Sequence, residues 1–174
     1  MADVPDFLTL RHHRDLGGRE SRPWARRVLL LLLATVLVLG LGNVFGQRPA
    51  TARAETSEAA LEVYAPSRVR SGLMFMGRFR IEAKRDIESA TLVLDPGWLE
   101  SITLNTVEPA PVGEASRDGR LALDFGHVAA GSPVLVFLQF QVNPTNVGHR
   151  SQAVELHDGE RRLLRVEREV TVFP

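Results

Sequence analysis

The stretch FMGRFRIEA, residues 75–83, alternates apolar and polar side chains with a period of two. The apolar positions are Phe75, Phe79, Ile81 and Ala83, and the charged positions between them are Arg78, Arg80 and Glu82. Successive side chains of a β-strand point to opposite faces of its sheet. The stretch therefore predicts a strand that buries one face in a core and turns the other toward solvent, as the strands of a β-sandwich do.

A second strand, VLVFLQFQV at residues 134–142, follows the same period. Its first face is entirely apolar: Val134, Val136, Leu138, Phe140 and Val142. Its second face begins with Leu135 and Phe137 and ends with Gln139 and Gln141. Because only the start of the second face is apolar, we expect this strand either to be central in its sheet or to meet a partner with its mixed face.

Shorter strands of the same kind lie on both sides of these two. We expect them near residues 61–64, 90–94, 99–107, 120–125, 151–156 and 162–173. Turn signals separate several of them: Asp95-Pro96-Gly97, Asp118-Gly119 and Asp158-Gly159. About seven or eight strands at close spacing, with no helical stretch between them, predict an all-β fold, an immunoglobulin-like antiparallel β-sandwich.

The segment GRLALDFGHVAAGSPVLVFLQFQVNP, residues 119–144, resembles the rear half of bacterial immunoglobulin-like domains of exported or surface proteins. The resemblance is carried by a strand ending in Phe125-Gly126, a loop with a second glycine, Gly131, and a long apolar strand. It implies fold and surface location, and it brings no catalytic residue. The chain has no antibody-type cysteine pair, and Trp98 sits in a turn instead of mid-strand, so the antibody-like subclass is not expected.

Ahead of the β region, the run VLLLLLATVLVLGLGNVFG at residues 28–46 contains no charged residue. As a helix rising about 1.5 Å per residue, it can cross the roughly 30 Å hydrocarbon core of a bilayer. Six arginines lie before it: Arg11, Arg14, Arg19, Arg22, Arg26 and Arg27. Only Arg48 and Arg53 follow closely, and Trp24 and Phe45 flank the run as interfacial aromatic residues do. Because positive residues favour the cytoplasmic side, we expect a single-pass transmembrane helix with its N-terminus inside.

An alternative is a cleaved export signal, because Ala50-Thr51-Ala52 has the small-x-small pattern that a signal peptidase recognises. The protein would then be exported after cleavage near Ala52. Against this, the apolar run exceeds the roughly 7 to 15 residues of a signal h-region. Arg26-Arg27 also admit a twin-arginine signal, although paired arginines beside a span are ordinary orientation determinants. We favour the uncleaved anchor.

These features divide the chain into four segments. Residues 1–27 are expected to be a disordered cytoplasmic tail, and residues 28–46 the transmembrane helix. Residues 47–60, which are small and polar, are expected to form a stalk. Residues 61–174 are expected to be one extracytoplasmic β-sandwich domain. The expected location is the cell membrane, with the C-terminal domain outside.

Composition excludes several functions. The chain has no cysteine, so it can form neither disulfides nor thiolate metal sites, and it has no cysteine nucleophile. From Glu55 onward, seventeen Asp and Glu face thirteen Arg and Lys, a net charge of −4, which gives no basic footprint for nucleic acid. Lys84 is the only lysine among 21 basic residues, a usage typical of a GC-rich bacterial genome.

The sequence offers no motif for catalysis or metal binding. His127, His149 and His157 each lie near a predicted turn and lack a metal-ligand spacing. Asp118 and Asp158 are explained by Asp-Gly turns, and neither a D-x-D-x-D-G calcium loop nor a G-x-S-x-G elbow occurs. We therefore expect a protein that is not an enzyme and that binds no cofactor or metal.

Two surface features remain as candidate sites. Two strand starts are apolar on both faces, which predicts partner contacts at Phe75, Met76 and Phe137, unless these strands are central and covered on both sides. Trp98 and Tyr64 are candidates for stacking on a ligand, and of the two only Trp98 lies in a turn expected to be exposed. The leading hypothesis is a membrane-anchored interaction module, an accessory or assembly protein that binds another envelope protein or itself. The alternative is a carbohydrate- or small-ligand-binding domain.

Overall fold

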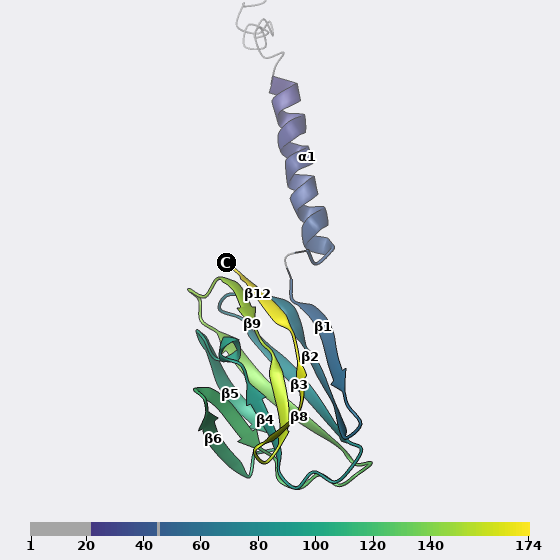
Figure 1. Cartoon of the computed structure of the whole chain (residues 1–174). Coiled ribbons are helices and arrows are strands. Elements are labelled where there is room, and N and C mark those ends of the chain that lie inside the picture. The colour runs from purple at the N-terminus through teal and green to yellow at the C-terminus, as the bar shows by residue number, and fades with distance from the viewer. Residues whose placement is uncertain (1–21, 45) are drawn as a thin grey trace, which may run out of the picture. The chain divides into compact units, whose positions relative to one another are not determined.

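The computed structural model describes residues 22–44 and 46–174, which belong to two compact units, Met1–Val44 and Phe45–Pro174 (Figure 1). In the first unit, helix α1 covers Arg22–Leu41. Its Pro23–Leu41 portion is long and apolar enough to cross a membrane, as the helix of a membrane anchor or of a signal sequence is. Most of the expected tail (residues 1–21) and Phe45 lie outside the described residues.

Helix α1 begins and ends earlier than the predicted span of residues 28–46. Pro23 lies in its first turn, where the missing N–H has no helical partner to lose and the fixed φ suits the helix. At the other end Asn43 has a φ of +53°, and the Val44 N–H donates to the Leu39 carbonyl at 3.1 Å. This left-handed exit is a Schellman-type C-cap, so the helix stops although the apolar sequence runs on.

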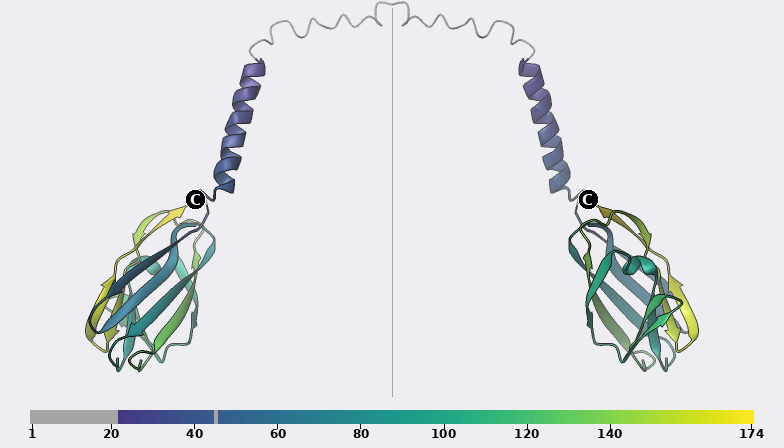
Figure 2. Two further views of the ribbon diagram at one scale, coloured as in Figure 1. Left: turned by 90° about the vertical axis from the view of Figure 1, so that its right-hand side faces the viewer. Right: turned by 90° about the vertical axis from the view of Figure 1, so that its left-hand side faces the viewer.

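The second unit is built from two sheets (Figure 1), seen from two further sides in Figure 2. The large sheet has the order β5-β8-β3-β2-β12-β9, and β1 also pairs with β2. Its strands are β1 (Arg48–Glu55), β2 (Ala59–Arg70), β3 (Met74–Ala83), β5 (Ile102–Glu108), β8 (Pro133–Val142), β9 (Gly148–Ser151) and β12 (Glu169–Phe173). The small sheet has the order β11-β10-β4-β7-β6. Its strands are β4 (Ala90–Leu94), β6 (Gly113–Arg117), β7 (Arg120–Asp124), β10 (Val154–Asp158) and β11 (Arg161–Val166).

The predicted all-β sandwich preceded by one helix is confirmed, with twelve strands in the described chain instead of seven or eight. Neighbouring strands are antiparallel except β2 and β12, which run parallel at residues 68–70 and 171–173. The strand predicted at residues 162–173 is divided between the sheets, as β11 and β12, and the strand predicted at 151–156 corresponds to β10 and the last residue of β9. A further strand, β6, forms after the proline-rich loop, where none was expected.

The predicted stalk at residues 47–60 is wrong, because β1 lies there and is part of the large sheet. All eight of its residues are paired antiparallel with β2. Ala52 and Ala54 pack against the core. Ala59 and Ala60, also assigned to the stalk, begin β2 and are buried. In β1, alanine alternates with polar residues at the two-residue period of a strand. Because alanine is small, composition alone does not distinguish this strand from a linker.

Strands β9 to β12 form one long hairpin, the β9–β12 ribbon, whose two arms change sheets. β9 pairs with β12 in the large sheet, and β10 pairs with β11 in the small sheet. One arm passes from sheet to sheet at Gln152 and the other at Arg168. The Gln152 N–H donates to the Arg168 carbonyl at 2.9 Å. The ribbon therefore stays paired through its bend and ties the two sheets together along one side.

Trp98 fills the core beside this bend. It ends the 3-10 helix η3 (Pro96–Trp98), and its side chain is fully buried. Its ring lies 5.0 Å from that of Phe140 and 5.4 Å from that of Phe79, and its indole N–H donates to the Ala153 carbonyl at 3.3 Å. A Cβ on the preceding Gly97 would clash with the Ser151 carbonyl oxygen. Only glycine therefore fits at position 97, next to the ribbon.

Arg168 satisfies the polar groups that the bend leaves inside. Its guanidinium donates to the Gln152 side-chain oxygen at 2.7 Å and to the β2 carbonyls of Ala65 and Pro66 at 3.2 and 2.9 Å. The same group lies 4.8 Å from the centre of the Trp98 ring, a cation–π contact. Burial lowers the pKa of Arg168 to about 10, so the side chain remains charged at neutral pH. One partly buried charge thus joins the ribbon, β2 and the core tryptophan.

Replacing Arg168 with Met should lower the free energy of unfolding by about 3 kcal/mol, because the two β2 carbonyls and Gln152 lose their donor. Arg168→Lys should recover part of the loss. Urea unfolding of the full chain in detergent, followed by near-UV circular dichroism, measures the difference. The control Arg85→Met changes an exposed arginine outside any ion pair of the described residues and should cost less than about 0.5 kcal/mol. Equal losses in the two variants would contradict this role of Arg168.

Candidate functional site

The predicted contact residues fall on opposite faces of the large sheet. Phe75 points into the core, where it is 5% exposed and its ring stacks on Phe140 at 5.1 Å. The prediction of Phe75 as a partner contact is therefore wrong, because its position in β3 faces the other sheet. Met76 is 54% exposed on the outer face, and Phe137 is half-buried there.

The outer face of the large sheet carries neighbouring apolar side chains, here called the apolar patch: Tyr64 on β2, Met76 on β3, and Leu135 and Phe137 on β8. Strand pairing places Arg78 opposite Tyr64 on one side and opposite Phe137 on the other. Its guanidinium lies 5.0 Å from the centre of the Tyr64 ring. The most exposed members reach 39% to 54% exposure, so the patch is open to solvent.

Paired charges flank the apolar patch on the same face. Arg53 lies 3.2 Å from both Glu55 and Glu82, and Arg80 lies 2.8 Å from Glu82. Lys84 completes the group through Glu55. Because these side chains are partly exposed, their pairs contribute little stability. They give the patch a polar rim of the kind that surrounds the centre of many protein interfaces.

Glu155 is the centre of a second cluster, on the outer face of the small sheet. One carboxylate oxygen lies 3.1 Å from Arg120 and 2.9 Å from the His157 ring. The other lies 3.0 Å from Arg165 and 3.3 Å from Arg162. The Glu155 side chain is only 5% exposed, so it is a buried charge with every acceptor direction occupied.

Asp95 extends this cluster toward the ribbon. Its carboxylate lies 2.6 Å from Arg165 and 3.5 Å from Arg120, which both also bind Glu155. Beneath them Val93 points to the same outer face, next to Glu155 in the pairing, and is fully buried. The aliphatic parts of long arginine side chains can cover apolar surface. Here the guanidinium groups of Arg165 and Arg120 bind the same two carboxylates, those of Asp95 and Glu155. The small sheet therefore closes its own outer face.

Hydrogen bonds set the state of the acid and the imidazole at the centre. Burial alone would raise the pKa of Glu155, but hydrogen bonds from His157, Arg120 and Arg165 outweigh it and hold the pKa at about 2. Arg117 donates to His157 Nδ1 at 3.0 Å, so this nitrogen is an acceptor and Nε2 carries the proton given to Glu155. His157 lies in β10, directly before the predicted Asp158-Gly159 turn, and it is buried instead of exposed in a loop.

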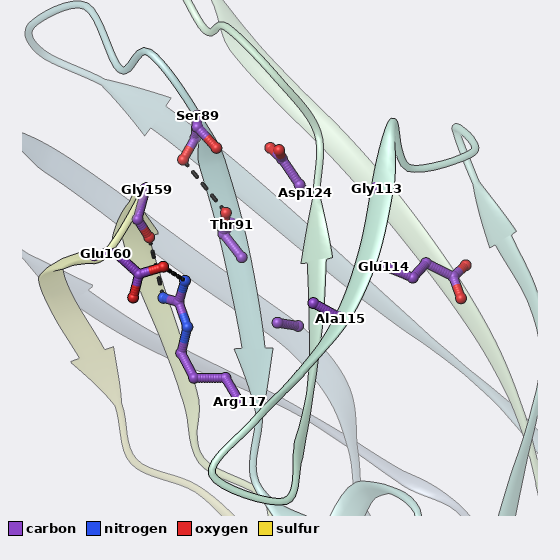
Figure 3. Close-up of a pocket in the computed structure, with 10 residues that line it drawn as sticks. Ser89, Thr91, Gly113, Glu114, Ala115, Arg117, Asp124, Gly159 and Glu160 are labelled. Carbon is purple, nitrogen blue, oxygen red and sulfur yellow. Dashed lines mark hydrogen bonds and ion pairs between the residues drawn. The ribbon is translucent and has the colours of Figure 1, made fainter.

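A groove of about 280 Å³ opens beside this cluster, between the strands of the small sheet and the β10–β11 turn (Figure 3). Arg117 reaches from β6 toward that turn, donating to the Gly159 carbonyl and to Glu160, both at 3.0 Å. Asp124 accepts from the Gly126 N–H at 2.8 Å. Because these charged side chains already bind groups of the protein, we assign the groove no ligand.

Trp98 is not available to a ligand. It was expected in an exposed turn, but it is fully buried between Phe79 and Phe140, so the stacking prediction is wrong. The turn signal at Asp95-Pro96-Gly97 was read correctly as a change of direction, yet η3 turns under the ribbon instead of out to solvent. The alternative of a carbohydrate-binding domain that uses Trp98 and Tyr64 therefore loses Trp98, while Tyr64 is 39% exposed.

Sequence reasoning missed the polar clusters around the buried Glu155 and around the partly buried Arg168. A local signal exists, because Glu155 and His157 alternate with apolar residues in β10, and Arg165 does so in β11. That signal identifies an outward strand face only. Which arginine meets which carboxylate depends on strand pairing between distant segments, and a single sequence does not reveal it.

No three His, Asp or Glu side chains in the described ranges gather so as to hold a metal ion. The sequence matches no protein-family model and no curated protein sequence. The resemblance to bacterial surface immunoglobulin-like domains thus stays a prediction at the level of the family. The chain does have the two-sheet β-sandwich that this resemblance implied.

Several solved structures are similar to the chain at low identity. One is AvmM, which catalyzes macrocyclization in alchivemycin A biosynthesis, at 7% identity and a TM-score of 0.44, with 74% of this chain and 90% of AvmM covered. Another is the CARDB domain of a Pyrococcus furiosus protein in complex with di-metal ions, at 15% and 0.37, covering 69% and 98%. A third is the Pseudomonas fluorescens alkylpurine DNA glycosylase AlkC bound to DNA containing an abasic site analog, at 13% and 0.33, covering 63% and 28%. None of these similarities assigns a function to this chain.

Replacing Glu155 with Gln should flatten the acid arm of the stability–pH curve. The folded-state pKa of about 2 lies below the ordinary 4.5, so Glu155 contributes stability above about pH 4.5 that is lost as the pH falls toward 2. The full loss is about 3 kcal/mol. Urea unfolding across this pH range should show the loss in the wild type and in the exposed control Glu108→Gln, and not in Glu155→Gln. Parallel acid arms in all three proteins would refute the assignment.

Proposed function

We propose that this protein is a membrane-anchored interaction module of the bacterial envelope. Helix α1 is a single-pass anchor, the tail before it is cytoplasmic, and the sandwich lies on the other side of the membrane. The sandwich binds another envelope protein or a second copy of itself. The observation that carries the proposal is the apolar patch, which the described chain leaves exposed on the outer face of the large sheet.

The position of β1 supports an anchor that is not cleaved. Cleavage after Ala52 would remove the first five of the eight residues of β1. Ala52 is paired with Val63 and packs against the core, so the cut would strip a central stretch of β2 of its neighbour. An unpaired strand edge is a template for aggregation. An export signal that ended inside a structural strand would damage the domain it delivers.

The charge distribution supports the orientation. Six arginines precede residue 28, three of them in the first turns of α1, and only Arg48 and Arg53 follow within a short distance. Short flanking segments rich in arginine are retained on the cytoplasmic side. This bias puts the sandwich outside the cytoplasm, where a domain without cysteine has no thiol to oxidise.

The two outer faces of the sandwich differ in what they offer a partner. The small sheet covers its face with the Glu155 cluster, whose groups bind one another. The large sheet presents Met76, Leu135 and Tyr64 beside a rim of paired charges. Methionine and aromatic side chains are enriched at the centre of protein interfaces, and methionine adapts its shape to its neighbours. We therefore assign the partner to the large sheet.

A photo-crosslinking amino acid at Met76 should capture the partner in native membranes, with mass spectrometry to identify the product. The same amino acid at Ala115, exposed on the small sheet, is the matched control and should give no dominant product. One dominant foreign protein would make the chain an accessory subunit, and crosslinks to itself alone would make it a self-assembling module. The absence of a product from Met76, or identical products from both positions, would refute the proposal.

Met76→Asp should weaken the same association at least about tenfold, because the interface would bury a carboxylate without a partner. Val112→Asp puts the same charge at a more exposed apolar position outside the patch and should leave binding unchanged. Co-purification from detergent extracts measures both, with circular dichroism to verify that each variant is folded. Equal binding by the two folded variants would exclude the apolar patch as the contact.

A further inference from the structure

One end of the sandwich, here called the linker-side end, gathers the start of β1, the end of β2 and the end of β12 (Figure 1). The Gln47 side chain donates to the Met74 carbonyl at 2.9 Å, which holds the entry of the chain against β3. In the loop after β2, the Ser71 N–H donates to the Phe173 carbonyl at 2.7 Å. The domain is therefore connected to α1 at the same end at which β12 finishes.

This end is basic, although the domain as a whole is acidic. Arg48, Arg68 and Arg70 are exposed there, and strand pairing places Arg48 opposite Arg68. None of the three takes part in an ion pair with an acidic side chain of the described residues, and Arg70 donates to the Pro174 carbonyl at 3.4 Å. From Glu55 onward the chain carries a net charge of −4, so this group stands out against a negative body.

Two exposed apolar side chains accompany the arginines. Leu73 lies in the loop after β2 and is 45% exposed, and Val147 lies in the loop after β8 and is 51% exposed. The Val142 N–H donates to the Leu73 carbonyl at 3.0 Å, which keeps the two loops side by side. Arginines beside exposed apolar side chains form the kind of surface that settles at the boundary between headgroups and acyl chains.

The connection to α1 is short. Only six residues, 42–47, separate the end of α1 at Leu41 from the start of β1 at Arg48. Fully extended, a segment of this length spans about 20 Å. If α1 crosses the membrane, the linker-side end cannot move far from the headgroups, which are strongly attractive to arginine when they are anionic.

We propose that the linker-side end is a membrane-contact surface that binds the anionic headgroups of the bilayer in which α1 sits; this inference rests on the anchor proposed above. Each arginine near an anionic surface raises the binding equilibrium about fivefold. Leu73 and Val147 enter the interface, and the acidic body of the domain is repelled by the same surface. The domain stands on its basic end and leaves the apolar patch free for a partner.

The experiment uses the full chain in lipid discs and exploits the lack of cysteine. Thr145→Cys carries a fluorophore at the linker-side end, and Ala130→Cys carries it at the opposite end, where Gly131 bonds to the last residue of β3. The discs contain nitroxide-headgroup quenchers in zwitterionic or phosphatidylglycerol-containing lipid. The linker is lengthened after Val44 by about 20 Gly and Ser residues, a coil about 25 Å across, so that tethering alone no longer holds the end at the surface.

With the long linker, the label at residue 145 should be quenched at least about threefold more than the label at 130 in anionic discs, and no more than that label in zwitterionic discs. Arg68→Glu should remove the difference, whereas Arg85→Glu, the matched control at the opposite end, should keep it. Equal quenching of the two labels in anionic discs overturns the proposal, as does an equal effect of the two charge reversals.

Failure of the anchor is measured separately, because a chain that separates from the discs on flotation refutes the membrane span itself. A chain that floats with the discs but shows no preference between the labels refutes only the lipid contact. Shielding of residue 145 in native membranes but not in discs assigns this end to a protein partner, which also overturns the lipid contact.

Discussion

A partly buried guanidinium at the bend of the β9–β12 ribbon is the constraint on which closure of the sandwich depends. A hairpin whose arms pass from one sheet to the other interrupts both ladders at the crossing, and the freed carbonyls need donors where water does not reach. Arg168 supplies donors to β2, and Gln152 supplies one to the Gly97 carbonyl at 3.4 Å. Because the chain has no cysteine, it cannot use an inter-sheet disulfide of the kind found in antibody domains.

The two outer faces of the sandwich differ in how their apolar residues are covered. On the small sheet, arginines and two carboxylates bind one another so completely that the apolar residue beneath them, Val93, has no exposure. On the large sheet, most charges pair around Glu82, Arg78 lies between Tyr64 and Phe137, and methionine and aromatic side chains remain in contact with solvent. Burying an isolated charge is costly, whereas an exposed methionine costs little. The asymmetry is therefore inexpensive to maintain, and it leaves one face closed and the other available.

The fold class could be predicted because alternation in residues 75–83 and 134–142 is a local property that survives in one sequence. The same alternation places Phe75 on the core side of β3. Its prediction as a surface contact was wrong because it relied on the apolar neighbours of Phe75 and not on the alternation. Strand β1 escaped prediction because alanine marks its inner positions, and small side chains carry a weak signal. The burial of Trp98 and the partners of Glu155 depend on how distant strands are paired, which is set by tertiary structure and not by any one segment.

The pairing of β1 with β2 along the whole length of β1 also determines how the domain responds to a pulling force. A force on the linker acts at Arg48 and runs along β1, parallel to the strand axis, from the end at which the chain enters the sheet. Hydrogen bonds between antiparallel strands lie across that axis, so the ladder is loaded in shear and its bonds share the force, instead of opening one after another as in a zipper. A flexible stalk in this place would extend before it transmitted tension. If the proposed anchor and partner pull on the domain from two sides, β1 transmits the force without such an extension, and its attachment to β2 breaks as a whole.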